Sequence, residues 1–168
     1  LAELDEIKQA YVDAALVAKA SGFAGVEIHG AHGYLLHQFL WAVTNRRSDR
    51  YGGGTVLERA RYPLEVVRAI RAAVGPDYPI SLRFSQWKEV DFEAKNMDVP
   101  TELEGFLAAF EDAGVDVFHA STRYFWAPEL DGSPLNLAGW AKKFTKKPVI
   151  AVGSVGLKID LFGGFLTP

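Results

Sequence analysis

The sequence predicts an α/β fold with parallel strands, built as part of a (β/α)8 TIM barrel. Short β-branched runs alternate with helical patterns along the 168 residues, giving about four βα units. Two of these units have the same layout, since "ALVAKASGFAGVEIHGA" and "FLAAFEDAGVDVFHAS" each join a helix, a glycine and a strand containing His. Such crossovers require parallel strands covered by helices. A whole barrel needs roughly 250 residues, so we expect residues 1–168 to form a partial TIM-barrel domain from a longer barrel.

The first two helices follow from apolar spacing. Residues Leu4, Ile7 and Tyr11 recur at intervals of three and four, which predicts an amphipathic helix ending near Gly22, followed by the strand "GVEIH". A second helix opens at a capping box, in which a Thr is followed three residues later by a Glu, and it stops at the Gly-Pro pair 75–76. The capping pair and the buried stripe expected in this helix are Thr55 with Glu58, then Leu57, Leu64, Val67, Ile70 and Val74.

The remaining elements repeat the alternation. The strand "PISLRFS" comes next, and a second capping box, Thr101 with Glu104, predicts a helix to about Ala113. The strand "VDVFHAS", a loop over 121–136, a short helix near 137–145 and the strand "KPVIAVG" follow, while "DLFGGFLTP" shows no obvious closing helix. A small doubly wound sheet is the competing architecture, but "HGAHG" after the first strand is not the glycine fingerprint that it requires.

Composition narrows the class of protein. Hydrophobic residues make up 49% of the chain, which is typical of one globular domain. The net charge of −3 and the lack of a basic window argue against nucleic-acid partners. With no cysteine and no apolar stretch of about 18 residues, we expect no disulfide, no thiolate chemistry, no membrane partner and a cytoplasmic protein.

Polar side chains share one face of the predicted strands. Alternation places Glu27 and His29 on one face of their strand, and Arg83 on the polar face of the next. Barrel interiors are mostly aliphatic, and burying unpaired charge is costly, so this face predicts a ligand site at the carboxyl ends of the strands. The alternative is a Glu27–Arg83 ion pair that only fills the barrel.

Histidines dominate the first of these loops. His29, His32 and Tyr34 fall within six residues of one βα loop, which favours a site. His37 fits packing or exposure on a helix better, and His119 at the end of another strand leaves site and core both open. Two histidines at this spacing could bind a metal, but no carboxylate is placed as a third ligand. We therefore predict no metal and assign the imidazoles as donors to a substrate oxygen.

The chain resembles the old yellow enzyme family of flavin-dependent NAD(P)H oxidoreductases. The resemblance runs from "GVEIHGAHGYLLHQFL" through "TNRRSDRYGGGTVLERARYPLEVVRAIRAAVG" to "ISLRFS". One small departure is Gly54-Thr55 at the entrance of the second helix, where the family usually has Ser-Leu or a similar pair. The motif residues are His29, His32, Tyr34, Leu35, Leu36, Gln38, Phe39, Asn45, Arg47, Asp49, Tyr51, Gly52, Gly53, Glu58 and Arg59.

Membership of the old yellow enzyme family would imply that FMN binds at the mouth of a barrel and is reduced by NADH or NADPH. It would also imply hydride transfer from the flavin to an electron-poor alkene or a similar small molecule. By the same resemblance His29 and His32 would bind the substrate oxygen and Tyr34 would donate a proton. Arg83 would lie by the pyrimidine side of the flavin. The cofactor-binding residues of the phosphate turn would be Gly153 and Ser154.

Other residues have weaker implications. Trp87 and Trp126 could line the substrate mouth or pack in loops, and "NRRSDRYGGG" is expected to be a salt-bridged loop that braces the site. The resemblance covers barrel strands four to seven, so two sheet edges would be unpaired. Because exposed edges invite pairing, we expect a homo-oligomer. The alternative function is a truncated, flavin-free half-barrel that self-associates without catalytic activity.

Overall fold

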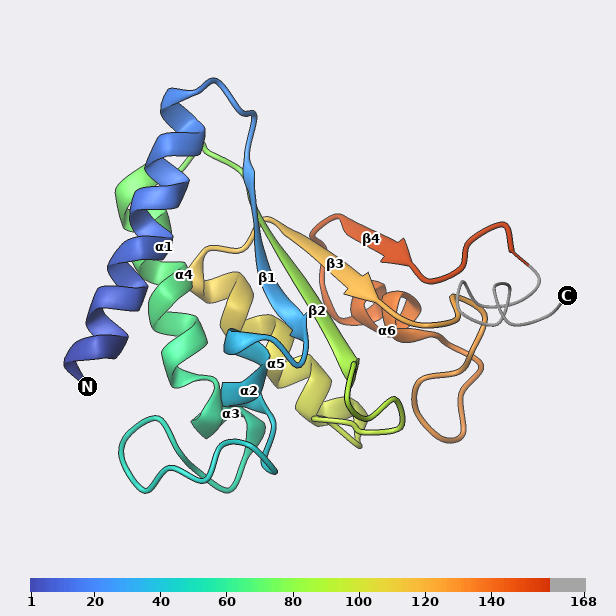
Figure 1. Ribbon diagram of the computed structural model, residues 1–168. Coiled ribbons are helices and arrows are strands. Elements are labelled where there is room, and N and C mark those ends of the chain that lie inside the picture. Colours follow the sequence, from blue (N-terminus) through green and yellow to red (C-terminus); the bar gives the residue numbers. More distant parts are fainter. Residues whose placement is uncertain (158–168) are drawn as a thin grey trace, which may run out of the picture.

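The computed structural model describes residues 1–157, which form a four-stranded parallel sheet covered by helices (Figure 1). The strands are β1 (Val26–His32), β2 (Ile80–Lys88), β3 (Val117–Ser121) and β4 (Val149–Val152), in the order β1-β2-β3-β4. Each strand therefore pairs with its neighbour in sequence. This confirms the α/β fold with four parallel strands, while the closing stretch "DLFGGFLTP" lies outside the described residues.

The helices follow the order of the strands. The first is α1 (Ala2–Ala20), and α2 (Leu35–Leu40) directly follows β1. The chain continues through α3 (Val56–Arg59) and α4 (Arg61–Val74), then α5 (Pro100–Ala113) and α6 (Leu137–Phe144). Helix α1 packs on α4, α4 on α5, and α5 on α6, so that they cover one side of the curved sheet (Figure 1).

The helix expected after Thr55 is divided in two. The predicted capping box forms, because the Thr55 hydroxyl accepts the N–H of Glu58 and the Glu58 carboxylate accepts the N–H of Thr55. The prediction for Leu57 was wrong: its side chain is 40% exposed, whereas Val56 is buried. A new helix starts at Arg61, so the periodicity of α4 does not extend back into α3. The rest of the predicted stripe, from Leu64 to Val74, is buried.

The second predicted capping box, unlike the first, is not formed. Helix α5 begins at Pro100 and its N-cap is Val99, so Thr101 lies inside the first turn. Proline is common at the first position of a helix, because its φ is already helical and its missing N–H is not needed there. The start of α5 has a different side-chain hydrogen bond in place of a capping box: the Glu102 carboxylate accepts the N–H of Asp98. The predicted end at Ala113 is correct.

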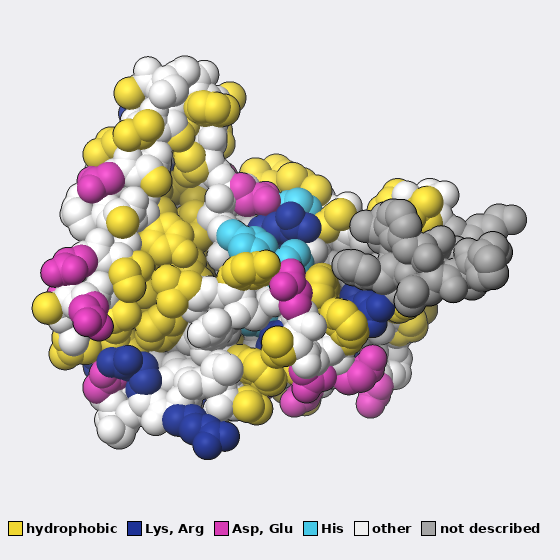
Figure 2. Space-filling view, viewed as in Figure 1, with side chains coloured by type: hydrophobic (Ala, Val, Ile, Leu, Met, Phe, Trp, Pro, Cys, Tyr) yellow, Lys and Arg dark blue, Asp and Glu magenta, His cyan; other side chains and the backbone are white. Residues whose placement is uncertain are grey.

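The two faces of the sheet differ as alternation predicts. Ile28, Leu82 and Phe118 point into the helix-covered core and are at most 3% exposed. The opposite face carries polar groups, which gather at the centre of the molecule in Figure 2. The Glu27–Arg83 ion pair is not formed, because the Glu27 carboxylate instead accepts the Ser81 hydroxyl and lies 2.9 Å from Nδ1 of His119.

Two further properties concern the described part of the chain. No helix within residues 1–157 is both long and apolar enough to cross a membrane. Within the same residues, no three His, Cys, Asp or Glu side chains are grouped in a way that could hold a metal ion.

Candidate functional site

The site begins where β1 leaves the sheet. The β1–β2 register shifts between Gly30 and His32, and His32 pairs with Lys88. His32 then takes a φ of 62° and Gly33 a φ of 89°. This left-handed turn reverses the chain before α2, and the N–H of His32 donates to the Ser85 hydroxyl at 2.9 Å. The bulge and the turn together bring consecutive residues of the loop to one edge of the sheet.

The three side chains predicted to form the site lie together. The ring of His29 is 5.1 Å from that of His32 and 5.1 Å from that of Tyr34, measured between centroids. Trp87, at the end of β2, stacks on His32 at 4.4 Å. The structure thus places two imidazoles and a phenol from one βα loop at the carboxyl end of a parallel sheet.

Both imidazoles are neutral near pH 7. Burial lowers the pKa of His32 to about 4, with the positive charge of Arg83 acting in the same direction. Burial and Arg83 also lower the pKa of His29. Nε2 of His32 lies 2.8 Å from the Ser121 hydroxyl at the end of β3. Each ring therefore has one N–H to donate and one acceptor nitrogen.

Tyr34 is the most open of the three, with half of its surface exposed. Its hydroxyl donates to the carboxylate of Glu89, at 3.2 and 3.3 Å from the two oxygens. The negative charge of Glu89 raises the pKa of Tyr34. Sequence reasoning missed Glu89, and the only available signal was its place just beyond the strand that carries Arg83.

A cavity of about 260 Å³ adjoins His32. Arg83 donates to Ser121 at 3.4 Å, while its Nε is buried without a hydrogen-bond partner. The cavity also extends to the turn after β4, so it brings together four of the six predicted residues, while His29 and Tyr34 lie beside it and do not line it. The lining residues that matter for the site are His32, Arg83, Trp87, Ser121, Gly153 and Ser154.

The turn after β4 is tightly packed. Gly153 has a φ of 149°, and a Cβ at this position would lie 2.5 Å from the carbonyl oxygen of Thr122. The backbone of Ser154 is in the left-handed region, with a φ of 54°, and the Ser154 hydroxyl donates to the carbonyl of Arg123 at 3.0 Å. Only glycine fits the first position, so the backbone itself forms this wall of the cavity.

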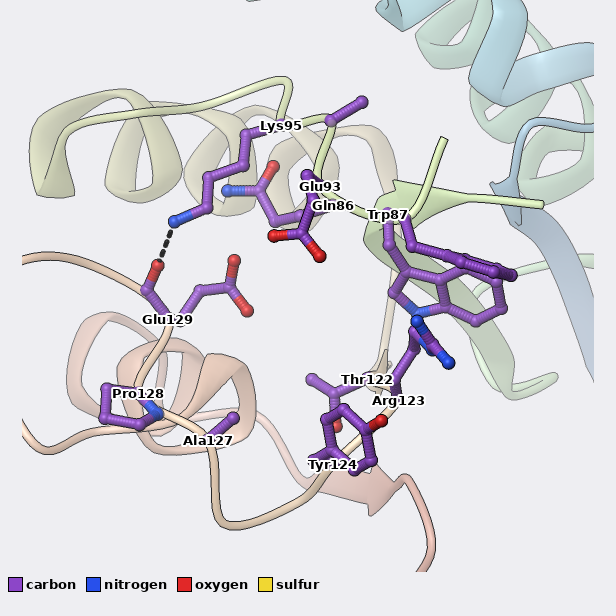
Figure 3. Close-up of a pocket in the computed structure, with 12 residues that line it drawn as sticks. Gln86, Trp87, Glu93, Lys95, Thr122, Arg123, Tyr124, Ala127, Pro128 and Glu129 are labelled. Atoms are coloured by element: carbon purple, nitrogen blue, oxygen red, sulfur yellow. Dashed lines mark hydrogen bonds between the residues drawn. The ribbon is translucent and has the colours of Figure 1, made fainter. Parts of the chain in front are cut away.

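A second hollow, of about 170 Å³, continues from the first between the loops after β2 and β3 (Figure 3). Trp87 and Thr122 line both hollows. On the far wall the Lys95 ammonium donates to the carbonyl of Glu129 at 2.6 Å. Burial raises the pKa of the Glu129 carboxyl to about 7. Nothing in the sequence pattern had indicated this extension.

The other residues singled out in the sequence divide between site and scaffold. His37 is fully buried, as the packing interpretation requires. His119 lies next to the carboxylate of Glu27 on the polar face of the sheet, and 15% of its side chain is exposed. Trp87 lines the cavity, whereas Trp126 is 46% exposed and makes tilted and edge-on contacts with the loop aromatics Tyr124 and Phe125. The run "NRRSDRYGGG" forms the expected salt-bridged loop through Arg47–Asp49 and Arg50–Glu65.

Comparisons with known proteins identify the family of the chain. Residues 2–159 match the model of the NADH:flavin oxidoreductase / NADH oxidase family. The chain belongs to this family. It is 43% identical to an NADH oxidase of Thermoanaerobacter brockii over 161 residues, which cover 91% of this chain and 24% of that protein. It is also 31% identical to an NADPH dehydrogenase of Bacillus subtilis, covering 94% of this chain and 45% of the relative.

The fold of this family member also matches solved structures. A morphinone reductase mutant in complex with tetrahydroNAD superposes with a TM-score of 0.73 at 29% identity, covering 91% of this chain and 40% of that one. The chain thus spans between about a quarter and a half of the length of these relatives. This confirms both the old yellow enzyme resemblance and the partial-barrel architecture.

Proposed function

We propose that this chain is the strand-four-to-seven part of an FMN-dependent NAD(P)H oxidoreductase, which reduces electron-poor alkenes or similar acceptors. The observation that carries the proposal is the cluster of His29, His32 and Tyr34 beside the cavity of Arg83. Family membership supports the same chemistry. The residues 1–168 would then be one partial TIM-barrel domain of a longer, cytoplasmic enzyme.

The residues of the cavity fit a flavin phosphate ester. Nε of Arg83 is a buried donor without a partner in the described structure, which is the condition expected for a group that meets an acceptor atom of a ligand. At the other end, the tight turn of Gly153 and Ser154 offers backbone in place of side chains. Arg83 would hold the pyrimidine side of FMN, and Gly153 and Ser154 its phosphate. When bound, FMN supplies the hydride that NADH or NADPH provides.

The loop after β1 would bind the acceptor. Neutral His29 and His32 can each donate one N–H to a carbonyl or nitro oxygen, which stabilises the negative charge that develops there. Tyr34 has a raised pKa and so keeps its proton at neutral pH. It would donate that proton to the carbon opposite the one that receives hydride.

Binding of FMN and of a phenol tests these assignments. Titration of the chain with FMN should quench flavin fluorescence, and Arg83→Met should weaken this binding. In the loaded protein, His29→Ala with His32→Ala should weaken the affinity for 4-hydroxybenzaldehyde at least tenfold and leave FMN in place, because each lost hydrogen bond costs about 1 kcal/mol. An unchanged phenol affinity would remove the role of the two histidines.

A flavin-free half-barrel that self-associates is the second candidate function. Within residues 1–157, β1 and β4 each pair with a strand on one side only. Free strand edges are templates for pairing with another chain, so a homo-oligomer in which two copies share their edges is expected in this case. A colourless protein that takes up no added FMN and elutes as a dimer would favour it. A monomer at micromolar concentration would contradict self-association.

A further inference from the structure

The imidazole of His37 lies beneath the turn that presents His32 and Tyr34. It is fully buried, and its Nδ1 accepts the backbone N–H of Gly33 at 2.9 Å. We propose that His37 is the positioning residue of the site, because it fixes the backbone from which the substrate-binding imidazole and the proton donor project. The inference rests on the proposed function for its effect on ligands, although its structural part does not.

The turn needs an external support. His32 carries a side chain, yet its φ of 62° lies in the left-handed region, which side chains disfavour. Gly33 follows with a φ of 89°, and a Cβ there would touch Lys88 at 3.4 Å. Gln38 donates from its side chain to the carbonyl of Gly33 at 3.0 Å. Both peptide groups that flank Gly33 are therefore held by side chains of α2, the N–H by His37 and the carbonyl by Gln38.

The hydrogen bond from Gly33 determines the tautomer of His37. Because Nδ1 accepts, the ring proton is on Nε2, which requires an acceptor of its own. The amide nitrogen of Asn96, Nδ2, lies within hydrogen-bond distance of Nε2. Because two donors cannot bond to each other, the tautomer requires the amide to be turned over so that its oxygen faces the ring, and this orientation also gives a partner to an oxygen that otherwise has none.

Asn96 is itself anchored to the sheet. Its N–H donates to Oε1 of Gln86 at 3.0 Å, and Nε2 of Gln86 donates to the carbonyl of Met97 at 2.6 Å. Gln86 is a buried residue of β2. A continuous set of hydrogen bonds thus runs from β2 through Asn96 and His37 to Gly33, and it joins the loop after β2 to the turn after β1.

His37 remains an acceptor across the working pH range. Burial lowers its pKa to about 3, and the ammonium of Lys88 together with the neighbouring His32 and His29 acts in the same direction. Lys88 is also fully buried, with its ammonium 4.9 Å from the ring of Trp41. A protonated His37 could not accept from Gly33 and would add a second buried charge, so the neutral ring is the stable one.

The hydrogen bond from Gly33 to His37 supports one end of the site and not the other. His32 and Tyr34 project from the held turn, whereas Arg83 and Gly153 belong to β2 and to the turn after β4. Loss of the His37 contact should therefore disturb the grip on a substrate oxygen and leave the flavin end of the cavity intact. If His37 contributed only to the stability of the fold, its loss would not weaken substrate binding selectively while leaving flavin binding intact.

The test compares His37→Leu, which fills the space without polar atoms, with His37→Gln, which keeps a donor and an acceptor. Asn45→Ala is the control for a lost buried side chain, because Asn45 is also buried and donates to two backbone carbonyls, of Phe39 on α2 and of Tyr51, but makes no contact with Gly33. We would measure hydrogen exchange at the Gly33 amide and the NMR signals of His32 and Tyr34. In the FMN-loaded protein we would also measure the affinity for 4-hydroxybenzaldehyde.

In His37→Leu we expect the Gly33 amide to exchange about tenfold faster, in line with the loss of one buried hydrogen bond. The phenol should bind about tenfold more weakly with FMN affinity unchanged, His37→Gln should restore most of both, and Asn45→Ala should lower stability without either effect. Unchanged exchange and unchanged His32 and Tyr34 signals in a folded His37→Leu would overturn the proposal.

Two further outcomes are also decisive. If His37→Leu does not fold, Asn96→Ala takes its place in the test. This variant keeps His37 but removes the side chain that contacts Nε2 of its ring. Faster Gly33 exchange in that variant would support the proposal, and unchanged exchange would refute it. If the wild-type chain binds neither FMN nor the phenol, the proposed function fails, while Gly33 exchange in the variants still shows whether His37 holds the turn.

Discussion

The phenol of Tyr34 donates a hydrogen bond to the carboxylate of Glu89, a residue from the neighbouring strand connection. The two residues are 55 positions apart in sequence, and the N–H of Glu89 also donates to the carbonyl of His32 at 3.1 Å. Glu89 therefore touches both ends of the turn that forms the site. The nearby carboxylate disfavours a tyrosinate, which is why the pKa of Tyr34 is raised.

Glu89→Gln should lower the pKa of Tyr34 toward its ordinary value, because the neutral amide no longer repels the phenolate. The measurement is an NMR titration of the protein labelled with ¹³C at Cζ of tyrosine. Tyr11, on α1 and with a pKa raised by burial alone, is an internal reference whose titration should not move. A Tyr34 titration that is the same in both proteins would show that Glu89 does not control its acidity.

Stability should fall below pH 6.5 through His37. Its pKa is depressed in the folded state, so between about 6.5 and 3 the unfolded chain binds the extra proton and folding becomes less favourable as pH falls. Urea unfolding of the wild type should lose up to about 1.4 kcal/mol per pH unit more than His37→Gln does over this interval. Parallel pH profiles for the two proteins would contradict a buried neutral ring.

Gly153→Ala should weaken FMN binding and lower stability, because its Cβ would lie 2.5 Å from the Thr122 carbonyl. Gly156→Ala is the matched control, since Gly156 also has a positive φ, of 80°, but nothing within 4 Å of the added carbon. We expect the control to show only the backbone cost, of about 1 kcal/mol, and to retain FMN. Fluorescence titration and thermal unfolding report the two quantities.

The two predicted capping boxes give a direct comparison. Thr55→Ala should destabilise the chain by about 1 kcal/mol, because the hydroxyl accepts the N–H of Glu58 at 3.2 Å. Thr101→Ala should change stability by less than about 0.5 kcal/mol, because Thr101 is an exposed residue within the first turn of α5. Equal losses in denaturant unfolding would mean that the helix start at Pro100 is misassigned.

The fold was predictable because its signals are local. Alternation along β1 and β2 is enough to separate Ile28 from His29 and Leu82 from Arg83, and the structure keeps that division. The break between α3 and α4 was not predictable in this way. At this break the buried side chain of Arg59, the last residue of α3, donates to the carbonyl of Leu40, a contact made 19 residues away that no local pattern indicates.

The site was predictable only in part, for the same reason. His29, His32 and Tyr34 share one short loop, so a motif identifies them together. Glu89 and Asn96 reach the site from the connection after β2, and their roles depend on how two loops pack. The sequence pattern also could not show that His37 supports the turn, since a buried histidine on a short helix usually only packs.

The order β1-β2-β3-β4 has a consequence for how the chain acquires its structure. Each strand finds its partner in the unit made just before it, and α1, α4, α5 and α6 stack in the same sequence. A nascent chain can therefore add one layer at a time during synthesis, without waiting for a distant segment to emerge. Translation would complete the His29 loop first, then the connection with Glu89 and Asn96 that supports it, and last the turn of Gly153.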